Sequence, residues 1–194
     1  MKSEMHEVKA ALRQKVHATL KQLTPEKRAA GSAAVCALLK QQPFWQKAAG
    51  VLFFAPMPDE VNVWPLMEES LAGGKVAALP RYDPGANDYF ACRVQHPQHE
   101  IVAGHFGIRE PNRACPELSL ERLGLILVPG VAFTTAGARL GRGRGFYDRL
   151  LAETHTLKCG VAFDEQIVET IPAANLDVHM DFILTPTCCV TCEQ

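Results

Sequence analysis

The sequence has no apolar run that approaches the roughly 20 residues of a membrane-spanning helix. It also has no excess of charge of either sign, because 20 Lys and Arg residues against 21 Asp and Glu residues leave a net charge of -1. We therefore expect no membrane or nucleic-acid partner, and any anion site must be local. The first 22 residues lack the apolar core of a signal peptide, so we expect a cytoplasmic protein.

A complete set of cysteine or histidine pairs at zinc-finger spacing is also missing. The seven cysteines are an odd number, and in a chain of 194 residues this favours reduced thiols over a disulfide framework. The run CCVTC, from Cys188 to Cys192, has no second Cys or His pair to complete a zinc site. We therefore expect no metal there.

Short apolar segments alternate with helical patterns along most of the chain. Two helices are expected first, over Met5–Leu23 and then from a Thr24 cap to the residues before Pro43. Later helices are expected over 63–74 and from Gly145, and strands over 51–54, 75–80, 89–94, 123–130, 158–163 and 181–186. This order predicts an α/β fold: a single three-layer domain over residues 1–194, whose largely parallel central sheet is flanked by helices.

The stretch RLGRGRGFYDRLL, from Arg139 to Leu151, follows the most apolar expected strand and precedes a helix. Ligands of open α/β sheets bind at the carboxyl ends of the strands, and a helix N-terminus attracts anions. The three glycines allow backbone amides to converge on an oxygen, and Arg139, Arg142 and Arg144 add bidentate donors. These features predict a phosphate-binding loop, although the loop matches neither the Walker motif nor the dinucleotide fingerprint. The alternative is a surface turn with solvated arginines.

Carboxylates near this loop and at the end of an earlier strand are further candidates. Asp148 follows the glycines, and beside phosphates it would require a cation such as Mg²⁺ unless it only complements the helix dipole. Asp181 precedes the apolar FILT and is a second candidate for the same role. In APMPDEVN, Asp59 and Glu60 follow a strand, and Glu60 could accept hydrogen bonds from ring nitrogens or simply begin a helix.

Taken together, these segments resemble a known family. The stretch LILVPGVAFTTAGARLGRGRGFYDRLL is similar to the signature of the 5-formyltetrahydrofolate cyclo-ligase family, also called methenyltetrahydrofolate synthetases. The segments VKAALRQKV, PDEVN, ALPRY, GHFGIREP and HMDFILTP fit in order over nearly the whole chain. The resemblance implies an enzyme that uses ATP and Mg²⁺ to convert 5-formyltetrahydrofolate to 5,10-methenyltetrahydrofolate. The formyl oxygen would be phosphorylated before the ring closes, and ADP and phosphate would be released.

The resemblance also implies residue roles. Lys9 and Arg13, which share one helical face, would reach the ATP phosphates. The loop around ATP would comprise Arg139, Leu140, Gly141, Arg142, Gly143, Arg144, Gly145, Phe146 and Tyr147, with Arg142, Arg144 and Tyr147 as catalytic candidates. Asp148 and Asp181 would hold Mg²⁺, and the folate would be bordered by Ala55, Glu60, Tyr82, Phe106 and Phe146.

This sequence departs from the usual pattern of the family at three positions. Phe146 replaces a usual Tyr and loses a hydroxyl, Arg144 replaces a frequent Lys, and Phe106 replaces a larger Trp. Two other functions stay open at this point: a non-catalytic nucleotide- or RNA-binding relative on the same scaffold, and an ATP-dependent ligase for another amide. We expect a small-molecule substrate and a monomer or weak dimer.

Overall fold

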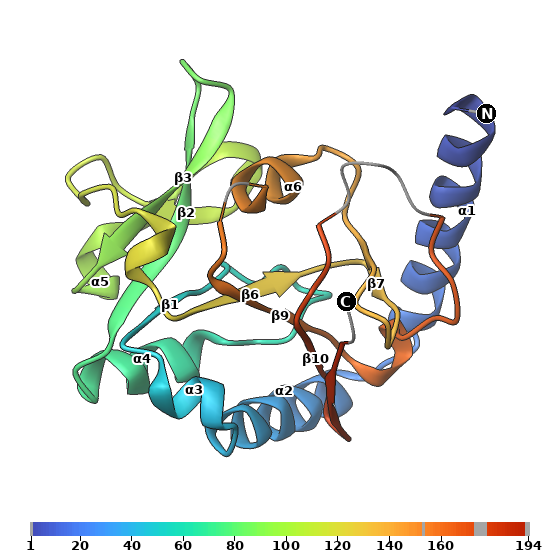
Figure 1. Cartoon of the computed structure of the whole chain (residues 1–194), viewed down its shortest axis with the longest axis horizontal. Helices are drawn as coiled ribbons and strands as arrows, with labels where there is room; N and C mark the ends of the chain where they lie inside the picture. The colour runs from blue at the N-terminus through green and yellow to red at the C-terminus, as the bar shows by residue number, and fades with distance from the viewer. Residues whose placement is uncertain (1, 153, 173–177, 193–194) are drawn as a thin grey trace.

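The computed structural model describes residues 2–152, 154–172 and 178–192, and its centre is a seven-stranded sheet (Figure 1). The strand order is β11-β10-β9-β6-β1-β2-β3. The strands are β1 (Gly50–Leu52), β2 (Val76–Asp83), β3 (Asp88–Val94), β6 (Leu125–Pro129), β9 (Leu157–Val161), β10 (Phe182–Leu184) and β11 (Cys189–Thr191). The five inner strands run parallel, and the edge strands β3 and β11 are antiparallel to their neighbours. The expected α/β fold with a largely parallel sheet is confirmed.

Helices cover both faces of this sheet. They are α1 (Lys2–Leu20), α2 (Pro25–Lys40), α3 (Pro43–Lys47), α4 (Trp64–Ala72), α5 (Pro97–Glu100) and α6 (Phe146–Leu151). Figure 1 shows α2 and α3 along one side of the sheet and α6 over the other. The buried residues of the strands alternate between the two faces accordingly: Leu125 and Leu127 pack in one core cluster, and Ile126 and Val128 pack in the other with Leu151 of α6.

Local sequence signals explain most of these boundaries. Thr24 caps α2 as expected, because its Oγ1 accepts a hydrogen bond from the Lys27 amide at 3.3 Å, and Pro25 occupies the first turn. The break before Pro43 is followed by the short helix α3, which periodicity did not predict. Strand β2 extends to Asp83, beyond the expected end at residue 80, because it pairs along its length with β3.

Three smaller features complete the fold. Strands β4 (Ile101–Ala103) and β5 (Arg109–Pro111) form a hairpin that encloses the 3₁₀ turn η1 (His105–Gly107). Strands β7 (Ala132–Phe133) and β8 (Arg139–Leu140) form a second hairpin, which begins directly after β6. Residues 189–191, within CCVTC, form the edge strand β11, which we did not expect.

The cysteines are consistent with the expected reduced thiols. All seven are free, and burial raises the pKa of the Cys92 and Cys192 thiols to about 11. In the described part of the chain, no group of three or more His, Cys, Asp or Glu side chains is placed to hold a metal ion.

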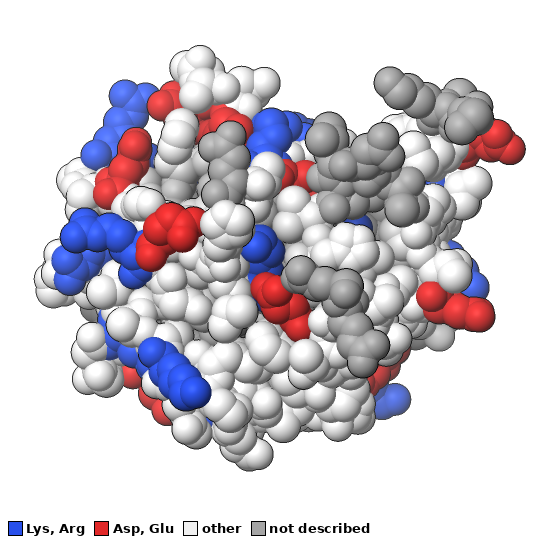
Figure 2. Space-filling model, in the orientation of Figure 1, with Lys and Arg blue, Asp and Glu red and all other residues white. Residues whose placement is uncertain are grey.

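The structure also shows the apolar character of the helices and how the charged side chains are distributed on one face. None of the described helices combines the length and the apolar character needed to cross a bilayer. On the face shown in Figure 2, basic and acidic side chains are interspersed, as the balanced composition predicts.

Candidate active site

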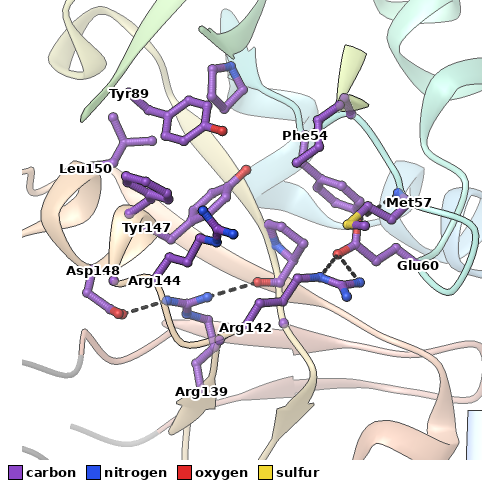
Figure 3. A pocket seen from close by; sticks show the side chains of 18 of the residues that line it. Phe54, Met57, Glu60, Tyr89, Arg139, Arg142, Arg144, Tyr147, Asp148 and Leu150 are labelled. Atoms are coloured by element: carbon purple, nitrogen blue, oxygen red, sulfur yellow. Dashed lines mark hydrogen bonds and ion pairs between the residues drawn. The ribbon is translucent and has the colours of Figure 1, made fainter. Parts of the chain in front are cut away.

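A cavity of about 300 Å³ lies at the carboxyl edge of β1 and β6, beside α6. Its position follows from the topology: β1 and β6 are parallel neighbours, so the segments that follow them leave the sheet at the same edge. The lining comes from four parts of the chain: Phe54, Ala55, Met57 and Glu60 after β1; Pro80 and Tyr89 from β2 and β3; Ile108, Arg109 and Glu110 beside or in β5; and residues between Pro129 and Leu150 (Figure 3).

Arg139 anchors the start of the glycine loop to the start of α6. Its side chain is only 5% exposed, and its Nη2 donates to Asp148 Oδ1 at 2.6 Å while Nη1 donates to the Pro129 carbonyl at 3.2 Å (Figure 3). The guanidinium carbon also lies 5.6 Å from the centre of the Tyr147 ring. A buried charged pair of this kind holds both ends of the loop in place.

The backbone of the loop requires glycine at two positions. Gly143 has φ 96° and Gly145, the N-cap of α6, has φ 67°, both in the left-handed region. Arg13 Nε, from α1, donates to the Gly141 carbonyl at 2.8 Å, which places a guanidinium against the loop from outside. Helix α6 has only six residues, so an anion at this loop would depend more on the arginines and the loop amides than on the helix dipole.

Arg142 reaches from the loop to the opposite wall of the cavity. Its Nε and Nη2 donate to Glu60 Oε1 at 3.2 and 3.0 Å (Figure 3). Nη2 also donates to Asp59 Oδ1 at 2.6 Å. Asp59 Oδ2 lies 3.3 Å from His17 Nδ1 of α1. The predicted phosphate-binding loop and the carboxylate expected at the folate site are therefore in direct contact.

Glu60 is a buried carboxyl group with defined partners. Its side chain is 9% exposed, and Oε2 accepts the Met57 amide at 3.0 Å. Burial raises the pKa of the Glu60 carboxyl above its ordinary value, although the Met57 amide and Arg142 act in the opposite direction. A ligand that donates hydrogen bonds to the Glu60 carboxyl would therefore offset the cost of its burial.

Tyr147, Phe146 and Tyr89 form the aromatic side of the cavity. Burial raises the pKa of the Tyr147 phenol far above its ordinary value, so the hydroxyl stays protonated and can donate a hydrogen bond. Phe146 and Tyr89 also line the cavity, with ring centres 5.0 Å apart. Tyr82 contacts both rings but lines a different hollow, where it stacks on His105 at 4.0 Å.

The structure does not bring together the two carboxylates expected to hold Mg²⁺. Asp181 immediately precedes β10, and its Oδ2 accepts the Lys158 amide at 2.7 Å near the start of β9. Since β9 and β10 are parallel, this is the amino edge of the sheet, whereas Asp148 lies beside the carboxyl edge. The expectation of a shared site for Asp148 and Asp181 within one chain is therefore corrected.

Asp148 alone still suits Mg²⁺ bound to a nucleotide. One of its oxygens pairs with Arg139 and the group borders the cavity, so its other oxygen remains a hard ligand at the phosphate side. Mg²⁺ typically takes one or two carboxylates and completes its shell with phosphate oxygens and water.

The other predicted residues divide into cavity residues and supporting residues. Ala55, Gly141, Arg144, Gly145 and Phe146 line the cavity. Leu140 is buried in the core and contributes its carbonyl, which accepts the Val131 amide, rather than its side chain. Lys9 is half-buried on α1, one turn before Arg13. The side chain of Phe106 lies outside the described part of the chain, although its backbone belongs to η1.

Several cavity residues have no strong signal in the sequence. Met57 precedes the predicted Asp59-Glu60 pair, and Tyr89 begins an expected strand, so proximity to predicted elements is their only sign. Arg109 and Glu110 come from an irregular segment whose composition suggests binding loops but selects no residue.

Comparisons with known proteins show which family the chain resembles over most of its length. The sequence profile of the 5-formyltetrahydrofolate cyclo-ligase family matches residues 5–186. The 5-formyltetrahydrofolate cyclo-ligase of Escherichia coli (strain K12) is 32% identical over 169 residues, covering 85% of this chain and 93% of that protein. A probable 5-formyltetrahydrofolate cyclo-ligase of Caenorhabditis elegans is 29% identical over 194 residues, covering 94% of each chain. The structure of Aquifex aeolicus 5,10-methenyltetrahydrofolate synthetase is similar, with a TM-score of 0.86 and 35% identity over 96% of this chain and 94% of that chain.

Proposed function

The chain belongs to the 5-formyltetrahydrofolate cyclo-ligase family, and from this premise we propose that its cavity cyclises 5-formyltetrahydrofolate to 5,10-methenyltetrahydrofolate with ATP and Mg²⁺. The observation that carries the assignment to this cavity is the contact between Arg142, in the glycine loop, and Glu60, on the opposite wall. It means that a triphosphate held by the loop and a pterin held by Glu60 would meet inside one enclosed space.

The reaction needs activation of a poor electrophile. The carbon of a formyl amide resists attack, and its oxygen is a poor leaving group. Transfer of the γ-phosphoryl group of ATP to the formyl oxygen gives an imidate-like phosphate and ADP. Nitrogen 10 of the folate then attacks the formyl carbon, its proton is lost, and the C–O bond breaks to release phosphate and the methenyl ring. Catalysis of this kind depends mainly on positioning and on charge neutralisation.

The phosphate side of the cavity supplies the positive charge. Gly141, Gly143 and Gly145 leave the loop backbone open to oxygen atoms, and Arg144 borders the same wall. Arg13 supports the loop through the Gly141 carbonyl, with Lys9 one turn away on α1. We assign these residues to the phosphates of ATP, in agreement with the roles implied by the family resemblance.

The folate side supplies a carboxyl group and apolar walls. Glu60 accepts hydrogen bonds from the N–H groups of the pterin, while Phe54, Ala55 and Met57 cover the ring. Phe146 and Tyr89 form the opposite wall. Tyr147, kept as a neutral donor by burial, is placed to hydrogen-bond the formyl oxygen or the phosphoryl group that it receives.

Arg142 is assigned to both halves of the reaction. Its guanidinium is bound by Asp59 and Glu60. A phosphate group would compete with these carboxylates for the guanidinium, and a pterin would compete with the guanidinium for Glu60. When a pterin takes Glu60, the Nε of Arg142 becomes available to the transferred phosphoryl group, while Nη2 keeps its bond to Asp59. Mg²⁺ would neutralise charge on the phosphates, and Asp148 is the residue that we assign to hold it.

The direct test is turnover of the purified protein. Incubation with ATP, Mg²⁺ and 5-formyltetrahydrofolate should produce the near-ultraviolet absorbance of the methenyl product, with one ADP released for each ring closed. Omission of ATP should abolish the signal. ADP release without methenyl formation, or no turnover of any kind, would contradict the proposed function.

A further inference from the structure

Arg109 differs from Arg139 and Arg142, two other arginines of the cavity, in its charge balance. It belongs to β5, lines the cavity, and is exposed. Arg139 is paired with Asp148, and Arg142 is paired with Asp59 and Glu60. Within the described ranges, no carboxylate lies within ion-pair distance of Arg109. An exposed guanidinium that borders a cavity and has no carboxylate partner is available to bind an anion.

Trp64 holds the Arg109 side chain in place. The guanidinium carbon lies 4.6 Å from the centre of the indole ring, which is a cation–π contact. Trp64 is the first residue of α4, and its amide donates to Asn62 Oδ1 at 3.1 Å, while the Asn62 amide donates to Ser32 Oγ at 3.0 Å. Because the indole ring holds the guanidinium carbon over its face, the planar guanidinium is kept near one position, and such a group can bind a carboxylate through two N–H donors.

The same contact lies where two hollows meet. A second hollow of about 310 Å³ is lined by Trp64 and Asn62 and shares Met57 and Glu60 with the main cavity, which Arg109 lines. A ligand bound to Glu60 that extends out of the cavity on this side would therefore pass the Arg109–Trp64 pair. Glu60 is the sole acidic residue among those that line this second hollow, so little negative charge opposes an anionic group there.

We propose that Arg109 binds a carboxylate of the glutamate tail of the folate substrate, with Trp64 as its support. The proposal rests on the proposed function, because it takes Glu60 as the partner of the pterin. A folate carries a p-aminobenzoyl group and then a glutamate, whose carboxylates are ionised at neutral pH. Arg109 is then a specificity-determining residue: it distinguishes a substrate that carries the glutamate carboxylates from a pteroate, whose one carboxylate sits directly on the benzene ring.

The test compares 5-formyltetrahydrofolate with 5-formyltetrahydropteroate, which lacks the glutamate. Binding to the wild-type protein, measured by calorimetry without ATP, should be about tenfold weaker for the pteroate, as expected for loss of one charge-assisted contact. R109A should bind the folate about tenfold more weakly than wild type and should bind the pteroate unchanged. R109K keeps the charge but not the planar fork, so it should give an intermediate loss.

R113A is the matched control, because Arg113 is an exposed arginine four residues away that lines a different hollow. It should bind both ligands as the wild type does. Equal binding of the two ligands by the wild type would overturn the proposal without using any variant. An equal loss for both ligands in R109A would overturn it as well, because that result indicates a structural defect.

Turnover separates this proposal from the proposed function. R109A should raise the KM for 5-formyltetrahydrofolate about tenfold and leave kcat and the KM for ATP unchanged. A wild-type protein that prefers the folate over the pteroate but forms no methenyl product would contradict the proposed function and leave the Arg109 contact supported. A wild-type protein that turns over both substrates with one KM would do the reverse.

Discussion

Arg142 and Glu60, 82 residues apart in the chain, are joined by two hydrogen bonds that end on the same carboxylate oxygen. Asp59 accepts a third bond from the same guanidinium. The contact ties the loop after β6 to the turn after β1, across the space where two substrates are proposed to meet. Its removal should therefore affect more than one ligand.

The first prediction concerns Arg142→Ala. Loss of a charge-assisted contact to the transferred phosphoryl group should lower kcat/KM for ATP. The transition state should lose roughly 1.5–3 kcal/mol of stabilisation. The substitution also leaves the buried Glu60 without its cation, so folate binding should change as well. Steady-state kinetics with each substrate varied in turn measures both effects. Arg122→Ala, which removes an exposed arginine outside the cavity lining, is the control and should behave as wild type.

The pH dependence of stability should report the burial of Glu60. Burial raises the pKa of its carboxyl in the folded chain above the ordinary value of about 4.5. The contribution of Glu60 to the free energy of unfolding is therefore fully present below pH 4.5. It is lost as pH rises through the folded-state pKa, because the folded chain must then ionise a buried group. Glu60→Gln stays neutral at every pH. As pH rises and the wild type loses stability, the free energy of unfolding of Glu60→Gln should therefore increase relative to that of the wild type.

Denaturant unfolding of both proteins from pH 4.5 upward measures this difference. Arg142→Ala in the wild-type background should make the decline with pH larger, since Arg142 favours the ionised carboxylate. Parallel stability curves for wild type and Glu60→Gln would show that the carboxyl group titrates normally.

Asp148→Asn and Asp181→Asn should have different consequences. Asp148→Asn breaks the 2.6 Å ion pair of a buried arginine, which should cost roughly 1–3 kcal/mol of stability. It should also raise the Mg²⁺ concentration needed for half-maximal rate. Asp181→Asn keeps an oxygen for the Lys158 amide and should leave the Mg²⁺ requirement unchanged. Magnesium titrations of the rate compare the two, and an equal increase for both would place Asp181 in the metal site after all.

Gly143→Ala should impair nucleotide use beyond its effect on stability. Its φ of 96° disfavours any residue with a Cβ, at about 1–2 kcal/mol, and a Cβ there would lie 3.5 Å from the Arg13 guanidinium. Gly74→Ala is the matched control, because Gly74 has a similar φ of 82° and no atom within 4 Å of an added Cβ. Both variants should lose stability, while only Gly143→Ala should raise the KM for ATP. Identical KM values would mean that the loop does not contact the phosphates.

Sequence reasoning predicted the sheet and the glycine loop because both depend on local signals. Apolar runs of strand length, a Thr-Pro helix start and glycines between a strand and a helix are visible within a few residues. The same reasoning misplaced Asp181, although the rule for parallel sheets contains the correction: a residue that precedes a strand lies at the amino edge, away from ligands that bind at the carboxyl edge.

Residues that reach the cavity through tertiary contacts were not predictable. Arg109 enters because the β4–β5 hairpin packs beside β2, and its stacking on Trp64 joins segments 45 positions apart that share no pattern. Tyr82 shows the opposite case: it was expected to line the folate site, but it pairs with Tyr89 in the β2–β3 ladder and lines a different hollow.

The ion pair between Arg139 and Asp148 has one more consequence, for how this loop can vary. It joins the last strand of a hairpin to the first turn of a helix, so the residues between them form a loop that is closed by the ion pair. A longer or shorter loop would change which nucleotide fits, while the Arg139–Asp148 ion pair, the hairpin and the helix stay as they are. Nucleotide selectivity and folding can therefore diverge independently in this part of the chain.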